Sequence, residues 1–148
     1  MQRIVWAILL ATERISIDGC KAAGPHFNPF NRSQGAPGDG ERQLGDLGNI
    51  FTAEGQSITP IDIIDDVLSL YDTEENIIGR TLVVHATKDD LGDGEEEASL
   101  TTGNEGGRVA CGLVDQEVNA KTAIVGLSGG SNILLTQVTL ICSPETNN

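Results

Sequence analysis

Positive charge and aromatic side chains are both scarce in this chain of 148 residues. Nine Lys and Arg stand against 22 Asp and Glu, which gives a formal net charge of −13. Such a surface repels polyanions, and this excludes nucleic acid and anionic membranes as partners. With 3 Phe, 1 Trp and 1 Tyr, any core must be built mainly from Val, Ile, Leu and Ala.

Cysteines and long apolar runs are also few. Cys20, Cys111 and Cys142 form no CxxC pair, so a zinc ribbon or a thioredoxin-like site has no support. One bridge and one free thiol would fit, but the sequence alone does not pair them. The apolar run Ile4–Ala11 has about half the length that crosses a bilayer. Because it follows the basic Arg3, it fits a short signal peptide. It fits equally a segment buried in the fold, as a strand or a helix turn.

Glycine, by contrast, is abundant, with 18 residues and no triplet period. This composition excludes collagen and indicates many turns and long ordered loops. Residues 19–49 and 86–107 are predicted to be such loops, because they are polar, glycine-rich and without periodicity. A loop of this length is usually functional or disordered, and His26 and Asp46 in the first one favour function.

The remaining apolar segments are typical of short strands, and no stretch has a sustained helical stripe. They predict one all-β domain over residues 1–148, a sandwich or barrel, rather than a disordered acidic chain. The predicted strands are Ile50–Thr52, Ser57–Ile64, Val67–Tyr71, Ile77–His85 and Arg108–Val114, followed by a hairpin of Ala123–Leu127 and Ile133–Cys142.

The chemistry-bearing residues are sparse. Both histidines of the chain, His26 and His85, lie in or beside the predicted loops, as does Asp46. Imidazole and carboxylate are suitable ligands for Zn²⁺ or Cu²⁺, provided that the fold brings them together. Each also has a plain structural interpretation: a histidine packed in a core, and an aspartate that caps an Asx turn. The pair Asp89-Asp90 could likewise be a solvated acidic turn.

Five blocks nevertheless carry a specific pattern: GPHFNPF, GDLGNI, IIGRTLVVH, DDLG and TGNEGGRVACG. In this order, over Gly19–Val114, they resemble the copper–zinc superoxide dismutase family. The resemblance implies an eight-stranded Greek-key β-barrel, here incomplete at the N-terminus, with a zinc loop and an electrostatic loop. It also implies a homodimer that binds copper and zinc and converts superoxide to oxygen and hydrogen peroxide, an antioxidant reaction.

Matched to the family motifs, five residues receive roles. His26 matches the imidazole that bridges copper and zinc, and His85 matches a copper ligand. Asp46 matches the zinc carboxylate, and Asp89 the carboxylate that links the copper and zinc histidines and orients them. Arg108 matches the arginine that guides superoxide. The resemblance also pairs Cys20 with Cys111 in a disulfide.

The departures from the family pattern are large. Gln34 and Gln43 stand where two zinc histidines are expected, and an amide oxygen is a weak zinc ligand. Two further copper histidines are expected on a strand shortly before Cys20, where the sequence has none. The 19 residues before Cys20 leave no space for the family's first three strands and part of the fourth. We therefore predict weak or partial metal binding and little or no dismutase activity.

Other interpretations remain open at this level. The chain could be an active enzyme that recruits replacement ligands, for example across a dimer interface. It could be a non-catalytic interaction protein, a decoy that pairs with true dismutases or with their copper chaperone. It is not that chaperone, because MxCxxC and CxC motifs are missing. The divergent ends, 1–18 and 115–148, fit a splice or gene-model variant. A cytoplasmic location is expected, or a secreted one if Met1–Ala11 belongs to a signal peptide.

Overall fold

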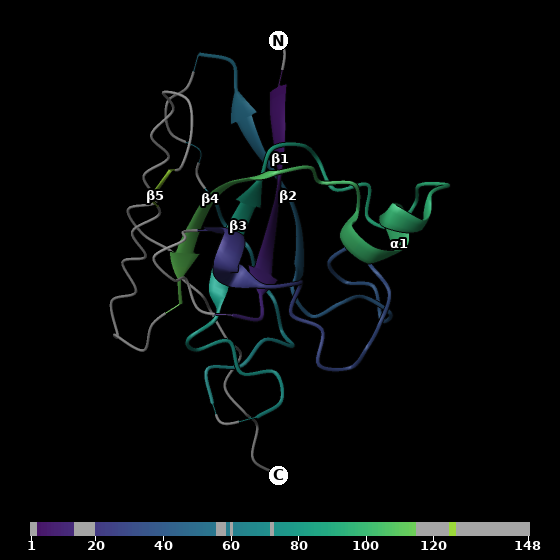
Figure 1. The fold of residues 1–148 in the computed structure, drawn as a ribbon, viewed down its shortest axis with the longest axis vertical. Helices are drawn as coiled ribbons and strands as arrows, with labels where there is room; N and C mark the ends of the chain where they lie inside the picture. The colour runs from purple at the N-terminus through teal and green to yellow at the C-terminus, as the bar shows by residue number, and fades with distance from the viewer. Residues whose placement is uncertain are drawn as a thin grey trace.

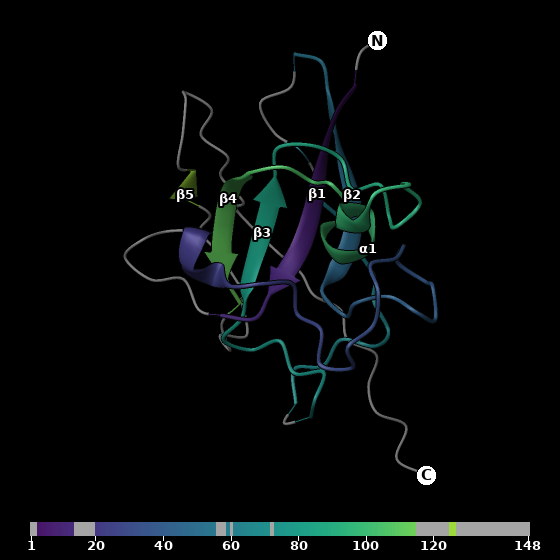
Figure 2. The same ribbon diagram turned by 45° about the vertical axis from the view of Figure 1, so that its right-hand side comes forward.

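A five-stranded antiparallel sheet is the centre of the molecule. The computed structural model describes residues 3–13, 20–55, 59, 61–71, 73–114 and 125–126, with the backbone alone for 3–6 and 125–126. The strands are β1 (Arg3–Ala11), β2 (Asp46–Ala53), β3 (Thr81–His85), β4 (Arg108–Leu113) and β5 (Val125–Gly126). They lie side by side in the order β2-β1-β3-β4-β5, as Figure 2 shows. The prediction of a mainly β fold is confirmed.

The apolar run near the start of the chain forms β1, the strand between β2 and β3. Its residues from Ile8 to Ala11 are at most 2% exposed. Successive side chains of a strand point to opposite faces, so a strand that is apolar at every position after Arg3 must be covered on both faces. Ile8 and Leu10 belong to one buried cluster, and Leu9 and Ala11 to another. Of the two sequence interpretations, the structure therefore supports the buried strand.

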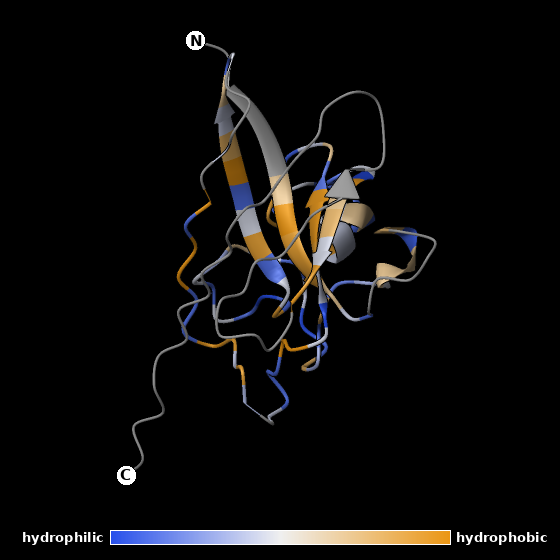
Figure 3. Cartoon of the chain, turned by 90° about the vertical axis from the view of Figure 1, so that its left-hand side faces the viewer, coloured by the Kyte–Doolittle hydropathy of each residue, from blue (hydrophilic) through white to orange (hydrophobic). Residues whose placement is uncertain are grey.

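The two clusters differ in size and in what they support. The strands that lie between the two clusters carry hydrophobic residues (Figure 3). The smaller cluster anchors the disulfide and consists of Leu9, Ala11, Cys20, Ala23, Val83 and Cys111. The larger one forms the main core and consists of Ile8, Leu10, Phe27, Leu44, Leu47, Ile50, Leu68, Ile77, Leu82, Val84, Ala110 and Val114.

The segment before β2 is fixed along β1 by backbone hydrogen bonds. The Phe27 N–H donates to Leu10 O at 2.8 Å, and the Leu10 N–H donates to Gly45 O at 2.9 Å. A β-carbon on Gly45 would lie 2.3 Å from Leu10 O, so only glycine permits this approach. The buried Arg42 fixes the turn before Asp46, because its guanidinium donates to three backbone carbonyls and pairs with Asp65. This packing brings His26 and Asp46 together.

Two predicted strands are wrong where the structure describes them. Residues 61–71 contain no strand, only an isolated bridge from Ser69 to Asn76. Asp65 Oδ1 accepts hydrogen bonds from the Val67 and Leu68 N–H groups, which closes a turn inside the apolar stretch. Side-chain oxygens of this kind compete with a strand ladder for the backbone donors. Residues 56–58 and 60 lie outside the description.

The other elements follow the prediction more closely. β3 covers the second half of the predicted strand Ile77–His85, and β4 ends one residue before the predicted Val114. The loops carry a short 3-10 helix (Cys20–Ala23) and α1 (Glu97–Thr102), which lies on the β2 side of the sheet (Figure 1). β5 lies within the first half of the predicted C-terminal hairpin. The second half and Cys142 lie outside the described residues. No helix among the described residues is long and apolar enough to cross a membrane.

Candidate functional site

His26 lies at the centre of the site. It forms an isolated bridge with Ala11 at the end of β1 and is 8% exposed. Its Nδ1 lies 3.2 Å from Asp46 Oδ1, and its Nε2 lies 2.8 Å from Glu105 Oε1. Burial alone lowers the pKa of an imidazole, but the hydrogen bonds to Asp46 and Glu105 outweigh it and raise the pKa of His26 to about 9. Both ring nitrogens therefore face carboxylates.

Asp46 begins β2 and is 1% exposed. Besides its contact with His26, its Oδ2 accepts a hydrogen bond from the Gly35 N–H at 3.1 Å. Burial raises the pKa of Asp46, while the interaction with His26 opposes this shift. The structure thus brings together two of the predicted ligands, His26 and Asp46, which are 20 residues apart in sequence.

His85 ends β3, with its ring centre 6.4 Å from that of His26. Its Nδ1 donates a hydrogen bond to Gly106 O at 2.8 Å, which leaves Nε2 as the lone-pair nitrogen. Nε2 is buried and has no hydrogen-bond partner among the described residues. Burial lowers the pKa of His85. A fixed ring with one free nitrogen is the form of histidine that binds a metal ion.

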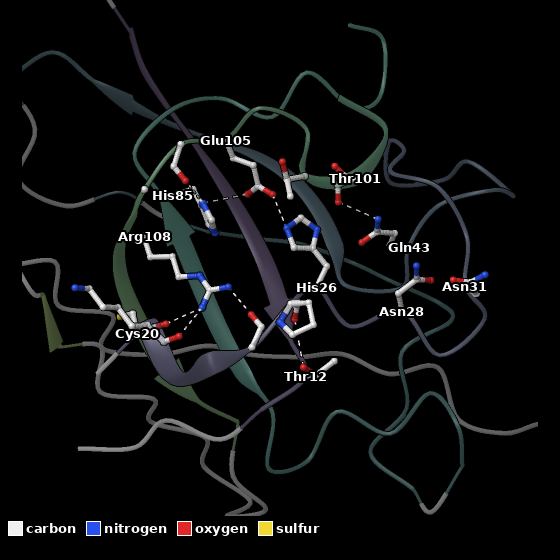
Figure 4. A pocket seen from close by; sticks show the side chains of 16 residues that line it. Thr12, Cys20, His26, Asn28, Asn31, Gln43, His85, Thr101, Glu105 and Arg108 are labelled. Atoms are coloured by element: carbon white, nitrogen blue, oxygen red, sulfur yellow. Dashed lines mark hydrogen bonds and ion pairs between the residues drawn. The ribbon is translucent and has the colours of Figure 1, made fainter. Parts of the chain in front are cut away.

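Glu105 is the residue that sequence reasoning missed. It is 2% exposed and lies between the two rings, where Figure 4 shows its carboxylate directed at both. Its Oε1 contacts His26, and its Oε2 lies 3.6 Å from His85 Nδ1. A glutamate among glycines is ordinarily a solvated loop residue, so the sequence contained no signal for this burial. Its position three residues before Arg108, in the TGNEGGR block, marks it as near the site but says nothing of its burial.

Gln34 and Gln43, the two positions where zinc histidines were expected, are buried and engaged in hydrogen bonds. Gln34 Nε2 donates to Asp89 Oδ2 at 2.7 Å, and Gln43 Nε2 donates to Thr101 O at 3.1 Å. Gln34 Oε1 is buried without a hydrogen-bond partner among the described residues. These amides connect the first long loop to the second.

Asp89 lies at the junction of the two long loops. Its backbone N–H and C=O both bond to the side chain of Asn49. Burial raises the pKa of Asp89 to about 6, and the charge of Glu105 adds to the shift. A β-carbon on Gly103, which has φ +60°, would lie 1.8 Å from Asp89 Oδ1, so the C-terminal end of α1 must be glycine here.

Arg108 and the disulfide form the opposite wall. Cys20 and Cys111 are joined by a disulfide, with their Cα atoms 5.5 Å apart, which confirms the predicted pairing. The Arg108 guanidinium donates to the backbone carbonyls of Cys20, Lys21 and Gly24. The sulfur bridge and the guanidinium therefore hold the segment before His26 against β4.

These walls enclose an open cavity of about 1270 Å³. It is lined by His26, His85, Glu105 and Arg108 on one part and by Gln43 on another (Figure 4). Asp46 and Asp89 are absent from its lining. A small anion could enter beside Arg108, but it would meet the Glu105 carboxylate next to the histidines.

The donor set does not fit the copper and zinc centre that the resemblance implies. Copper would require more imidazoles than His26 and His85 supply, and Glu105 already contacts His26 Nε2. On the other side of the ring, the 3.2 Å between His26 Nδ1 and Asp46 Oδ1 is close to the roughly 3.3 Å edge of a tetrahedral zinc site. There, however, the remaining donors are amides. No group of three or more His, Cys, Asp or Glu in the described part of the chain is arranged to hold a metal ion.

The fold and the site together have four features: a mainly β architecture, two buried histidines, a loop held by a disulfide, and a half-buried arginine at a cavity. This is the class of protein that the sequence resemblance led us to expect. The family model described as copper/zinc superoxide dismutase (SODC) matches residues 12–114, and the chain belongs to this family.

Individual relatives agree with this assignment. The chain is 54% identical over 97 residues to a superoxide dismutase [Cu-Zn] of Cryptococcus neoformans var. grubii serotype A, covering 66% of this chain and 62% of the relative. It is 53% identical over 97 residues to superoxide dismutase [Cu-Zn] A of Xenopus laevis, with the same coverages. The solved structure of the clock protein EA4 has a TM-score of 0.70 at 38% identity, covering 76% of this chain and 71% of that chain. The chain spans just under two thirds of the length of these curated relatives.

Proposed function

We propose that this protein is a copper–zinc superoxide dismutase-like protein in which the dismutation of superoxide is strongly impaired. One observation carries the proposal: both nitrogens of His26, the residue matched to the bridging ligand, are in contact with carboxylates. Loss of a single group that merely orients a ligand typically costs 10–100-fold in metal affinity, and several direct ligands are missing here. Copper and zinc binding is therefore expected to be weak or partial.

The proposed roles of the other residues follow from their positions. His85 Nε2 is the imidazole nitrogen without a hydrogen-bond partner among the described residues, and it is the residual copper ligand in this proposal. Arg108 guides anions, and its bonds to the Cys20 and Gly24 carbonyls fix its guanidinium at the cavity wall. Asp46 is the residual zinc ligand, and Asp89 orients the loop through Gln34. The net charge of −13 opposes the approach of superoxide, so Arg108 acts only locally.

A non-catalytic role as a partner of true dismutases, or of their copper chaperone, is the second candidate. The observation that favours it is the contrast between the few metal ligands and the scaffold features that are kept: the disulfide, the Arg108 contacts and the buried strands. Such a scaffold could form a homodimer, or a heterodimer with an active dismutase.

We also propose a cytoplasmic location. The support comes from β1: residues Ile8 to Ala11 are core residues, so removal of the Ile4–Ala11 run as a signal peptide would take away a strand that pairs on both edges.

The test is metal content after purification, combined with a superoxide-consumption assay on the full chain. The Cryptococcus relative, prepared in the same way, is the control. We expect sub-stoichiometric copper and a consumption rate far below that of the relative. Stoichiometric copper together with fast turnover would overturn the proposal.

A further inference from the structure

We propose that Glu105 is a built-in occupant of the copper side of His26, and that its carboxylate keeps metal ions away from the Nε2 nitrogen. This inference deepens the proposed function and rests on it, because it names the residue that closes the site. Loss of histidines alone would leave an open, weakened centre. The structure instead has a carboxylate in contact with the remaining ring.

The backbone holds Glu105 in place. It lies between Asn104 and Gly106, both of which have positive φ angles, of 56° and 72°. The Thr87 N–H donates to Glu105 O at 3.0 Å, which fixes the turn against the residues that follow β3. Two successive reversals of the chain therefore direct the side chain inward, where it is 2% exposed. The position of the carboxylate is set by the fold and not by a flexible loop.

The contacts of the carboxylate converge on His26. Oε1 lies 2.8 Å from His26 Nε2, whereas Oε2 is 3.6 Å from His85 Nδ1, whose hydrogen bond goes to Gly106 O. Neither Glu105 oxygen has a hydrogen-bond partner among the described residues, so its short contact with His26 is the ion pair that compensates its burial. A buried carboxylate is costly unless it is paired. The Arg108 guanidinium bonds instead to backbone carbonyls on the other wall, so His26 is the principal partner of Glu105.

The alternative is that Glu105 is a replacement metal ligand. The geometry disfavours this. A ligand would have to converge with the free nitrogen of His85, which is Nε2, but Glu105 lies on the Nδ1 side of that ring. At 2.8 Å, the oxygen and His26 Nε2 are also in direct contact, at hydrogen-bond length, rather than held apart around an ion. The arrangement is that of an occupied site.

The experiment is calorimetric titration of the metal-free full chain with Cu²⁺ and, separately, with Zn²⁺. It compares wild type, Glu105→Ala and Glu95→Ala. Glu95 is an exposed acidic residue in the same loop, so its substitution controls for the change in net charge. We expect Glu105→Ala to bind Cu²⁺ at least about tenfold more tightly than wild type and Glu95→Ala to change affinity less than twofold. The Cu²⁺ electron paramagnetic resonance spectrum of Glu105→Ala should gain nitrogen ligation.

Weaker binding in Glu105→Ala would identify Glu105 as a ligand and overturn the proposal, as would an affinity equal to that of Glu95→Ala. Circular dichroism checks that each variant folds. If Glu105→Ala does not, Glu105→Gln decides, because it keeps the volume and removes the charge; its affinity should also rise. The sign of the affinity change does not depend on turnover. A wild-type chain that proved to be an active dismutase would refute the proposed function, while the titration would still decide the role of Glu105.

Discussion

The two sides of the His26 ring face different groups. On the Nδ1 side, Asp46 remains and the neutral amides Gln34 and Gln43 stand at the positions matched to zinc histidines. On the Nε2 side, the strand before Cys20 supplies no imidazole, and the charged Glu105 contacts the ring. On the Nδ1 side, Asp46 lies at a spacing from His26 close to that of a zinc site, whereas on the Nε2 side a carboxylate is in direct contact with the ring.

The comparison shows that a site can be well ordered and still contain poor metal ligands. Gln34 and Gln43 each donate to an oxygen of the second loop, so the two long loops are joined by ordinary hydrogen bonds. Each such bond contributes about 1 kcal/mol, more where the acceptor is a charged carboxylate. The site is therefore preorganised by groups that are poor ligands. Three changes to the chain test this comparison of the two sides. The first removes the disulfide, which supports both sides.

Replacing Cys20 with serine should affect both sides equally and most strongly. The disulfide closes a loop of 91 residues and holds the segment before His26 against β4. The chain-entropy model gives a loss of about 4 to 5 kcal/mol in the free energy of unfolding. Urea denaturation without reductant measures it, and wild type with reductant should behave like the variant. An unchanged midpoint in both cases would contradict the structural role of the bridge.

Asp46→Ala should break the Nδ1 side while leaving Glu105 in place. The substitution removes the partner of His26 Nδ1 and of the Gly35 N–H in a buried setting. Removing one member of a buried pair costs about 3 kcal/mol or more in the free energy of unfolding. Asp39→Ala is the matched control, at an exposed position of the same loop where the carboxylate accepts a hydrogen bond from the Ala36 N–H, and it should cost less than about 1 kcal/mol. Equal losses in the free energy of unfolding of the two variants would show that the burial of the His26–Asp46 pair does not determine the cost.

Restoring imidazoles on the Nδ1 side should give the smallest change in free energy of the three. This change is the most specific, because it is a change in zinc binding. We expect the double variant Gln34→His, Gln43→His to bind Zn²⁺ at least about 100-fold more tightly, because imidazole replaces amide beside His26 and Asp46. Titration of the metal-free protein with Zn²⁺ measures this, and either single variant should gain less. If zinc affinity stayed at the wild-type value, the amides would not occupy ligand positions, and the Nδ1 side would be blocked as well.

The fold was predictable where local chemistry and tertiary packing agree. β1, β3 and β4 lie where continuous apolar runs stand, and the loops lie where glycine and polar residues gather. The prediction was wrong in residues 61–71, where Asp65 captures two backbone N–H groups that a strand would need. Hydrogen bonds of a single side chain decide such a stretch, and apolar content does not reveal them.

The sequence by itself determined the family, because motifs such as GPHFNPF and RTLVVH are local and their order is fixed along the chain. Through that resemblance it also indicated the disulfide partners and the positions where histidines are missing. Only the tertiary structure decided which group lies against the Nε2 side of His26. Glu105 and His26 are 79 positions apart, and nothing in either neighbourhood predicts that they meet. Their contact arises because β1 and β3 pair in the sheet while Gly106 and Asn104 turn the chain inward. The burial of a charge depends on what surrounds it in space, and a carboxylate whose sequence context is typical of an exposed loop lies buried against His26.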